Sequence, residues 1–209
     1  MDLTPIAEPI RARLDAKMGG REKALPASRD AIRNCANSIR ATHRGDNELA
    51  EQLMAKARAC LDTAQSALKG FPDVYYAGFL SDAEKEYAEA KLTAALIAGK
   101  PLPGPDEIGV GDAPYLNGMT EAIGELRRHV LDIMRHGNLE RGEELLQAMD
   151  DIYYMLISID YPDAITGGLR RSTDVARSIM ERTRSDLSLT LVQRNLQEAI
   201  AAHQKRLEG

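Results

Sequence analysis

The sequence predicts an all-α protein, and two observations support this prediction. Ala, Leu, Met, Glu and Arg abound, whereas aromatic residues make up only 4% and Trp is absent, a composition that favours helices over sheets. Caps, glycines and prolines divide the chain into segments of helical length, with no credible strand or internal repeat. The 209 residues, 44% of them apolar, suit one compact domain or two small ones. Because no linker is evident, we expect a single domain over 1–209.

Glycines, prolines and cap-forming residues place four helices in the first half of the chain. The glycine pair at 19–20 separates the first helix from the second, and the sequence "GKPLPGP" at 99–105 follows the fourth as a connecting loop. The expected helices are 4–18, 21–44, the segment from the cap-like "GDNE" at 45–48 to 70, and 74–98.

The second half of the chain begins with the clearest amphipathic pattern. We expect a fifth helix over 113–136, where apolar residues recur at spacings of four, three, four and three. These residues are Met119, Ile123, Leu126, Val130 and Ile133. A sixth helix lies within 139–163, and 164–209 forms one broken helix or two consecutive ones. The total is seven or eight helices.

Charge and cysteine content exclude several classes of protein. The formal net charge of −5 argues against a generally basic nucleic-acid binder, but the charge is uneven. Residues 11–44 carry nine Lys and Arg against three Asp and Glu, whereas residues 45–169 carry ten Lys and Arg against 22 Asp and Glu.

Cys35 and Cys60 are isolated thiols, which indicate neither a disulfide framework nor a zinc site. With no signal pattern and no membrane-spanning apolar run, we expect a soluble, cytoplasmic protein without a membrane partner.

Two pairs of glutamates are candidate metal ligands. Glu86 and Glu89 lie in "EKEYAEAK" at 84–91, with Glu86 at the edge of the apolar face, and Glu121 and Glu125 lie roughly opposite the apolar stripe of the next long helix. Alone, each pair is typical of a solvated helix face. If the two helices pack side by side, the four carboxylates can hold Mg²⁺ or Mn²⁺. Such ions activate water and stabilise a phosphoryl transition state.

Other catalytic sites find less support. A carboxylate-bridged di-iron bundle normally has Glu-x-x-His on two helices, whereas this chain offers only Glu125 and His129, four positions apart. No nucleophile elbow, reactive-cysteine signature or P-loop is present. We interpret "TGGLRR" at 166–171 as a helix break rather than a phosphate-binding loop.

A basic stripe follows the second expected helix, where four arginines fall within about 60° of one another. They are Arg29, Arg33, Arg40 and Arg44. The stripe is either a solvated flank or subunit edge, or a surface that contacts a phosphate backbone without sequence preference. Further arginines that follow residue 169 are candidates to extend this stripe, but the sequence does not place them relative to the acidic pairs. They are Arg170, Arg171, Arg177, Arg182 and Arg184.

Several motifs together resemble a known family. "LDAKMGGREKALPASRD", "THR", "EKEYAEA" and "PYLNGMTEAIGELRR" occur in the order and spacing of translin and translin-associated factor X. The resemblance covers nearly the whole chain and is closer to factor X (Trax), the catalytic branch. It implies a curved single-domain helical bundle of about seven helices that assembles into a closed octameric shell with nucleic acid inside.

The resemblance also implies roles for individual residues. Glu86, Glu89, Glu121 and Glu125 match the Mg²⁺-dependent ribonuclease site of the factor X branch, and Arg128 matches an arginine suited to phosphate contact. Glu121 stands where the eukaryotic catalytic subunit carries Asp, a shorter carboxylate. The Arg- and His-rich stretch that translin places before the first acidic helix is replaced here by "YYAGFLSDAEK".

The leading hypothesis is therefore a metal-dependent endoribonuclease that cleaves single-stranded RNA within a homo-oligomer, with single-stranded DNA or a short duplex as further ligands. The first alternative is a non-catalytic, translin-like oligomer that binds single-stranded RNA or DNA. The second is a purely structural helical assembly in which the arginine stripe makes subunit contacts.

Overall fold

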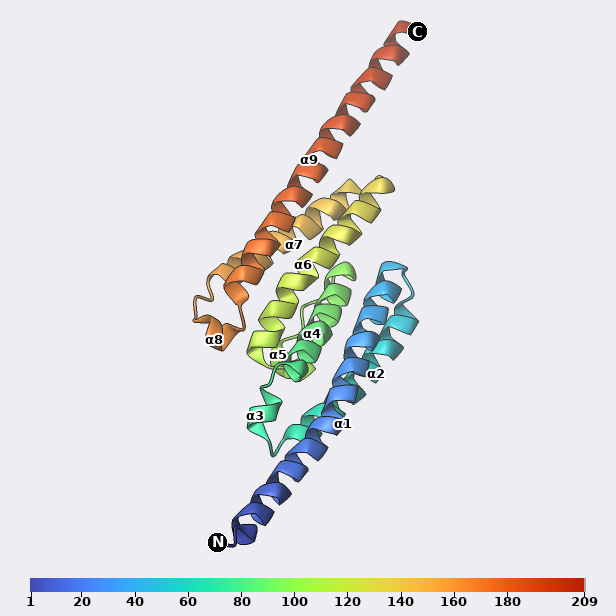
Figure 1. Cartoon of the computed structure of the whole chain (residues 1–209). Helices are drawn as coiled ribbons and strands as arrows, with labels where there is room; N and C mark the ends of the chain where they lie inside the picture. Colours follow the sequence, from blue (N-terminus) through green and yellow to red (C-terminus); the bar gives the residue numbers. More distant parts are fainter. Residues whose placement is uncertain (209) are drawn as a thin grey trace.

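The computed structural model describes residues 1–208, and over that range its only regular elements are helices (Figure 1). Six helices are long, and α3, α5 and α8 have four residues each. The bounds are α1 Thr4–His43, α2 Asn47–Leu68, α3 Pro72–Tyr75, α4 Phe79–Ile97, α5 Pro105–Ile108, α6 Asp112–Arg135, α7 Leu139–Ile157, α8 Asp163–Thr166 and α9 Leu169–Glu208. The all-α prediction is confirmed.

The long helices form an elongated bundle in which α4 and α6 occupy the middle (Figure 1). α1 and α2 make an antiparallel pair, α4 packs between that pair and α6, and α7 and α9 cover the other side of α6. One continuous apolar core runs through these layers, and its members include Leu61, Leu80, Leu92, Ile123 and Met149. Polar side chains between α4 and α6 are therefore partly shielded from water.

The predicted helix break at 19–20 is wrong, because α1 continues through both glycines. A Cβ on Gly20 would lie 2.8 Å from the carbonyl oxygen of Ala67 and 3.0 Å from the Phe71 ring. Gly20 therefore lets α1 pack closely against the end of α2. This tertiary contact outweighs the low intrinsic helix propensity of glycine.

The predicted break near "TGGLRR" is present between α8 and α9. Gly167 and Gly168 have φ angles of 63° and 85°, a left-handed conformation that glycine adopts without steric cost. The chain turns here and enters α9, a single helix of 40 residues. Of the two alternatives for 164–209, the structure has a short helix followed by a long one.

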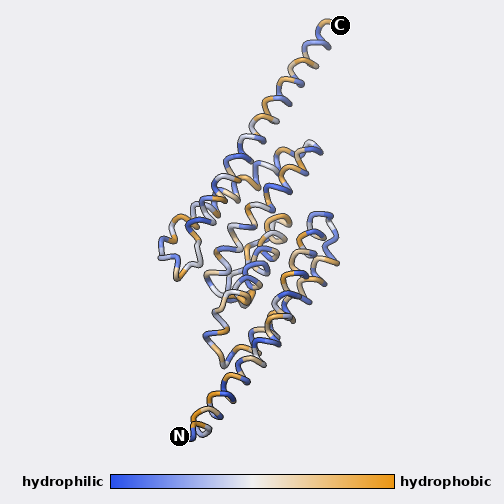
Figure 2. Tube along the Cα trace, viewed as in Figure 1, coloured by the Kyte–Doolittle hydropathy of each residue, from blue (hydrophilic) through white to orange (hydrophobic). Residues whose placement is uncertain are grey.

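The first half of α1 and the second half of α9 project from opposite ends of the bundle (Figure 1). Both projecting segments carry apolar side chains that are exposed in this chain, and Figure 2 shows hydrophobic positions recurring along both. They are Ile6, Ile10, Leu14 and Met18 on α1, and Leu189, Val192, Leu196 and Ile200 on α9. Among the helices of the described chain, none combines the length and apolar character needed to cross a membrane.

Candidate metal centre

α4 and α6 approach each other closely at Gly118. A Cβ there would lie 2.6 Å from the carbonyl oxygen of Lys85, 2.8 Å from Cβ of Ala88 and 2.9 Å from the backbone nitrogen of Glu89. Such distances leave no room for a side chain, so glycine is required. As a result, this part of the α4 backbone lies directly against α6, one turn before Glu121.

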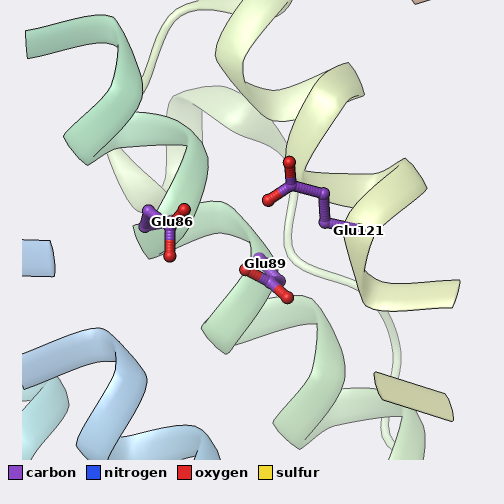
Figure 3. A group of neighbouring side chains, drawn as sticks. All are labelled: Glu86, Glu89 and Glu121. Atoms are coloured by element: carbon purple, nitrogen blue, oxygen red, sulfur yellow. The ribbon is translucent and has the colours of Figure 1, made fainter. Parts of the chain in front are cut away.

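The close packing brings together three carboxylates, Glu86 and Glu89 from α4 and Glu121 from α6 (Figure 3). Each offers one oxygen, and these oxygens all lie within 4.8 Å of one another. Figure 3 shows the Glu121 side chain directed from α6 toward α4. We refer to Glu86, Glu89 and Glu121 as the glutamate cluster. Within residues 1–208 it is the one group of three or more potential metal-binding side chains at such distances.

Burial and mutual repulsion make the glutamate cluster electrostatically unfavourable without a cation. Glu89 is 8% exposed. Its pKa is raised to about 8, first by burial and then by the negative charges of Glu86 and Glu121. Burial also raises the pKa of Glu86, although Lys85 opposes this shift. A bound cation would favour the ionised form of both carboxyl groups.

Lys85 provides positive charge at the glutamate cluster. Its Nζ atom lies 2.5 Å from Oε1 of Glu121 and 3.5 Å from Oε1 of Glu86. The ammonium group therefore occupies space beside the same oxygens that a metal ion would contact. Lys85 lies inside "EKEYAEAK", but helical spacing alone did not indicate that it would reach across to the neighbouring helix.

Glu125, the fourth predicted ligand, lies outside the glutamate cluster. Its Oε2 atom is 2.5 Å from Nε2 of His43 and 3.8 Å from Nη1 of Arg128. The hydrogen bond with His43 lowers the pKa of Glu125 despite its partial burial. His43 was missed as a site residue, and the one available signal was its place in the "THR" motif at the end of α1.

Glu125 is partly buried although it lies roughly opposite the apolar stripe of α6. Its side chain is 25% exposed, compared with 41% for Glu121. α6 packs against α4, α7 and α9, so more than one of its faces is covered. A single apolar stripe reveals only the most hydrophobic of those faces.

Glu84 begins the "EKEYAEAK" motif and has a structural role. It is 5% exposed and accepts hydrogen bonds from Nε2 of Gln65 at 2.7 Å and the backbone nitrogen of Gly111 at 3.3 Å. The carboxylate therefore ties α4 to α2 and to the start of α6. The three glutamates of this motif thus divide into one structural residue and two members of the glutamate cluster.

The predicted basic residues lie on the surface. Arg29, Arg33 and Arg40 of α1, Arg44 directly after it and Arg128 of α6 are all exposed. Nη2 of Arg33 is 2.5 Å from Oδ1 of Asp30, and Nη1 of Arg40 donates a 2.6 Å hydrogen bond to Asn37. Their assignment to RNA binding stays a prediction.

Cys35 and Cys60 are both free thiols. Burial raises the pKa of Cys35 to about 12, which keeps this thiol protonated and unreactive. His129, considered for a di-iron site, lies with its ring centroid 6.1 Å from that of His43. It is not part of the glutamate cluster.

Comparison with known proteins identifies one group of relatives. No family profile matches the chain. An uncharacterized protein of Methanocaldococcus jannaschii is 31% identical over 191 residues, which cover 90% of this chain and 82% of that protein.

Solved structures of C3PO, the translin and Trax complex, share the fold. AfC3PO in complex with duplex RNA superposes with a TM-score of 0.84 at 34% identity, over 90% of this chain and 97% of that chain. A crystal structure of AfC3PO gives a TM-score of 0.83 at 34% identity, over 90% of this chain and 98% of that chain. Apo-NeC3PO is 20% identical and therefore supports the fold alone. Its TM-score is 0.80, over 91% of this chain and 99% of that chain. The chain belongs to the translin family.

Proposed function

We propose that this chain is a Trax-like, metal-dependent endoribonuclease that cleaves single-stranded RNA within a homo-oligomer. The observation that carries the proposal is the convergence of Glu86, Glu89 and Glu121 from two helices, with ligand oxygens within 4.8 Å of one another. Glu125 completes the set of four carboxylates implied by the family resemblance.

The glutamate cluster fits a hard divalent cation such as Mg²⁺ or Mn²⁺. These ions prefer oxygen ligands, and carboxylates from two packed helices supply them at suitable separations. The raised pKa of the buried Glu89 also supports the fit, because neighbouring negative charges contribute to it. When bound, such an ion lowers the pKa of water and stabilises developing charge on a phosphoryl group.

The residues around the glutamate cluster supply further functions. Glu125, held by His43, would serve as the general base that accepts a proton from an attacking water. Arg128 is exposed beside Glu125 and is suited to contact a phosphate oxygen. The arginines of α1 would hold the RNA backbone without sequence preference.

The proposal of RNA as the substrate is supported by the relatives. AfC3PO, 34% identical to this chain, was solved with duplex RNA. We assign single-stranded RNA as the cleaved substrate on the family resemblance alone. Single-stranded DNA and short duplexes are expected to bind as further ligands, since contacts to phosphate carry no sequence information.

The proposal of a homo-oligomer rests on the projecting ends of α1 and α9. Four apolar side chains at intervals of four residues lie exposed on α1, and a similar set lies on α9. Exposed apolar surface of this kind is typical of protein interfaces. A closed octamer is the assembly implied by the family resemblance.

The test is incubation of fluorescent single-stranded RNA with the purified protein and Mg²⁺ or Mn²⁺. We expect endonucleolytic cleavage that EDTA abolishes and that Glu89→Gln or Glu121→Gln lowers at least about a hundredfold, as for loss of other groups that stabilise a transition state. Asp132→Asn is the matched control, since Asp132 also lies on α6 and its one ion pair among the described residues is with Arg135, at 4.0 Å. Full cleavage by both glutamate variants would refute the assignment.

A second candidate function, a non-catalytic oligomer that binds RNA or DNA, is favoured by the position of Lys85. Its contacts with Glu121 and Glu86 already balance part of the negative charge of the glutamate cluster without a metal ion. RNA binding without cleavage, together with no measurable Mn²⁺ binding, would support this candidate instead.

A further inference from the structure

A cavity of about 420 Å³ adjoins the glutamate cluster on the side of α9. Residues of α4 and α6 form one wall, and the first three turns of α9 form the other. The lining includes Glu89, Glu121, Arg171, Ser172, Val175 and Ile179. The volume lies in the range of small-molecule sites, so the cavity is large enough for one nucleotide unit.

A hydrogen-bond network fixes the start of α9 against α6. Asn117, 8% exposed, donates from Nδ2 to the carbonyl oxygen of Thr166 at 2.7 Å and accepts from the hydroxyl of Ser172 at 3.0 Å. Asn117 lies one turn before Glu121 on α6. The same network therefore sets the position of Arg171, next to Ser172, relative to the glutamate cluster.

Arg171 differs from its neighbour Arg170 in its contacts. Arg170 forms an ion pair with Asp160 at 3.1 Å and lines other surface hollows. Arg171 is exposed and makes no ion pair or side-chain hydrogen bond with any residue in the described part of the chain. Its guanidinium group is thus available to a ligand in the cavity.

The chemistry of the two walls is complementary. Glu89 and Glu121 alone would repel an anion, but Arg171 on the opposite wall supplies a planar, always charged donor that matches phosphate oxygens in bidentate geometry. Val175, 55% exposed, and Ile179 form an apolar surface one and two turns further along α9. A nucleotide has both features, a charged phosphate and a largely apolar ribose and base.

We propose that this cavity binds one phosphodiester unit of RNA, with Arg171 on the phosphate and Val175 and Ile179 against the ribose or base. The inference rests on the proposed function, because it places the substrate next to the glutamate cluster. It assigns substrate contact to one named arginine of α9 beside the glutamate cluster, whereas the sequence left the arginines after residue 169 unplaced.

The test compares Arg171→Gln with Arg170→Gln, which removes the same charge one residue away and outside the cavity. Binding of a short fluorescein-labelled oligouridylate to the full chain is measured by anisotropy in EDTA, where metal-dependent cleavage cannot interfere. We expect Arg171→Gln to weaken binding about tenfold and to reduce the salt dependence by about one phosphate contact. Arg170→Gln should change affinity less than about twofold, the range of an exposed ion-pair partner.

Two further measurements separate substrate contact from a structural role. Arg171→Lys keeps the charge but loses bidentate geometry, so we expect wild-type salt dependence with an affinity between those of wild type and Arg171→Gln. The thermal midpoint and the Mn²⁺ affinity of Arg171→Gln should not fall, because no described residue depends on this side chain.

Equal oligouridylate affinities for Arg171→Gln and Arg170→Gln would overturn the inference. If wild-type protein still cleaves RNA in that case, the proposed nuclease function survives. Conversely, selective weakening by Arg171→Gln in a protein that cleaves nothing would support the phosphate contact and reject the nuclease. Absence of oligouridylate binding to wild-type protein would also overturn the inference, and the cleavage assay would decide the nuclease separately.

Discussion

Nε2 of His43 lies 2.5 Å from Oε2 of Glu125, and this contact joins the end of α1 to the middle of α6. The His43 side chain is 3% exposed, and its Nδ1 atom has no hydrogen-bond partner among the described residues. Glu125 is therefore held by α1 rather than by the glutamate cluster. This arrangement gives Glu125 a fixed orientation that does not depend on a metal ion.

We expect His43→Ala to lower RNA cleavage about ten- to a hundredfold, the usual cost of removing a residue that orients a ligand or a base. His43→Gln, whose amide can still donate to Glu125, should recover part of the loss. Cleavage and Mn²⁺ affinity are measured at a temperature where circular dichroism shows both variants folded. Wild-type cleavage by folded His43→Ala would show that the contact with Glu125 has no positioning role.

Gly118→Ala should destabilise the protein by about 1–3 kcal/mol, because its Cβ would overlap the α4 backbone and force the two helices apart. The same displacement should weaken Mn²⁺ binding. Gly124→Ala on α6 is the control, since its nearest contact would be Ile179 at 3.9 Å, and the substitution should stabilise the helix by up to about 1 kcal/mol. Urea unfolding with and without Mn²⁺ checks both values, and similar effects of the two substitutions would contradict the close-packing argument.

The raised pKa of Glu89 predicts a specific pH dependence of stability. In the folded, metal-free protein the pKa of Glu89 is raised to about 8 from its ordinary value of 4.5, so between these values the folded state binds one proton more than the unfolded state. The free energy of unfolding should then fall by roughly a few kcal/mol as the pH rises from about 4.5 to 8. Urea unfolding in EDTA across this range measures the slope.

Glu89→Gln should remove this part of the slope, because the amide does not titrate. Saturating Mn²⁺ should also reduce the loss of stability with rising pH, because a cation favours the ionised carboxylate. A slope that is the same in wild type and Glu89→Gln would mean that Glu89 titrates normally.

Lys85→Gln should strengthen Mn²⁺ binding about tenfold, because it removes a positive charge from the oxygens that the ion would contact. Lys91→Gln is the matched control on the same helix, since Nζ of Lys91 lies 5.8 Å from the Tyr87 ring centroid instead. Isothermal titration with Mn²⁺ provides the measurement. Equal affinities for the two variants would place the metal away from Lys85.

Leu196→Glu should reduce the size of the assembly, because Leu196 is 60% exposed on the projecting part of α9 and a charge disfavours burial between subunits. Gln197→Glu adds the same charge to the adjacent residue and serves as control. Light scattering gives the mass of each. A monomeric wild-type protein at micromolar concentration would contradict the proposed homo-oligomer.

The sequence predicted helices best where local signals and packing agree. The bounds of α6 and α7 follow from apolar periodicity and caps, since Asn138 accepts a hydrogen bond from the backbone nitrogen of Arg141 as expected of an N-cap. The continuous α1 was not predictable, because the packing of Gly20 against Ala67 and Phe71 is a contact between distant parts of the chain.

The candidate site was predictable in its members but not in its arrangement. Motif order indicated Glu86, Glu89 and Glu121, and the structure brings them together. The separation of Glu125 from them depends on His43, which is 82 residues away in sequence. The place of Arg171 depends on the turn at Gly167 and Gly168, whose direction no helical periodicity specifies.

The length of α9 has a mechanical consequence. At 40 residues, it is a stiff rod about 60 Å long, with Arg171 near one end and the projecting apolar segment at the other. If a neighbouring subunit bound the far end of α9, a displacement there would also move the part of the helix that faces Glu89 and Glu121. In the proposed homo-oligomer, one uninterrupted helix would therefore connect a subunit contact to the wall of the substrate cavity.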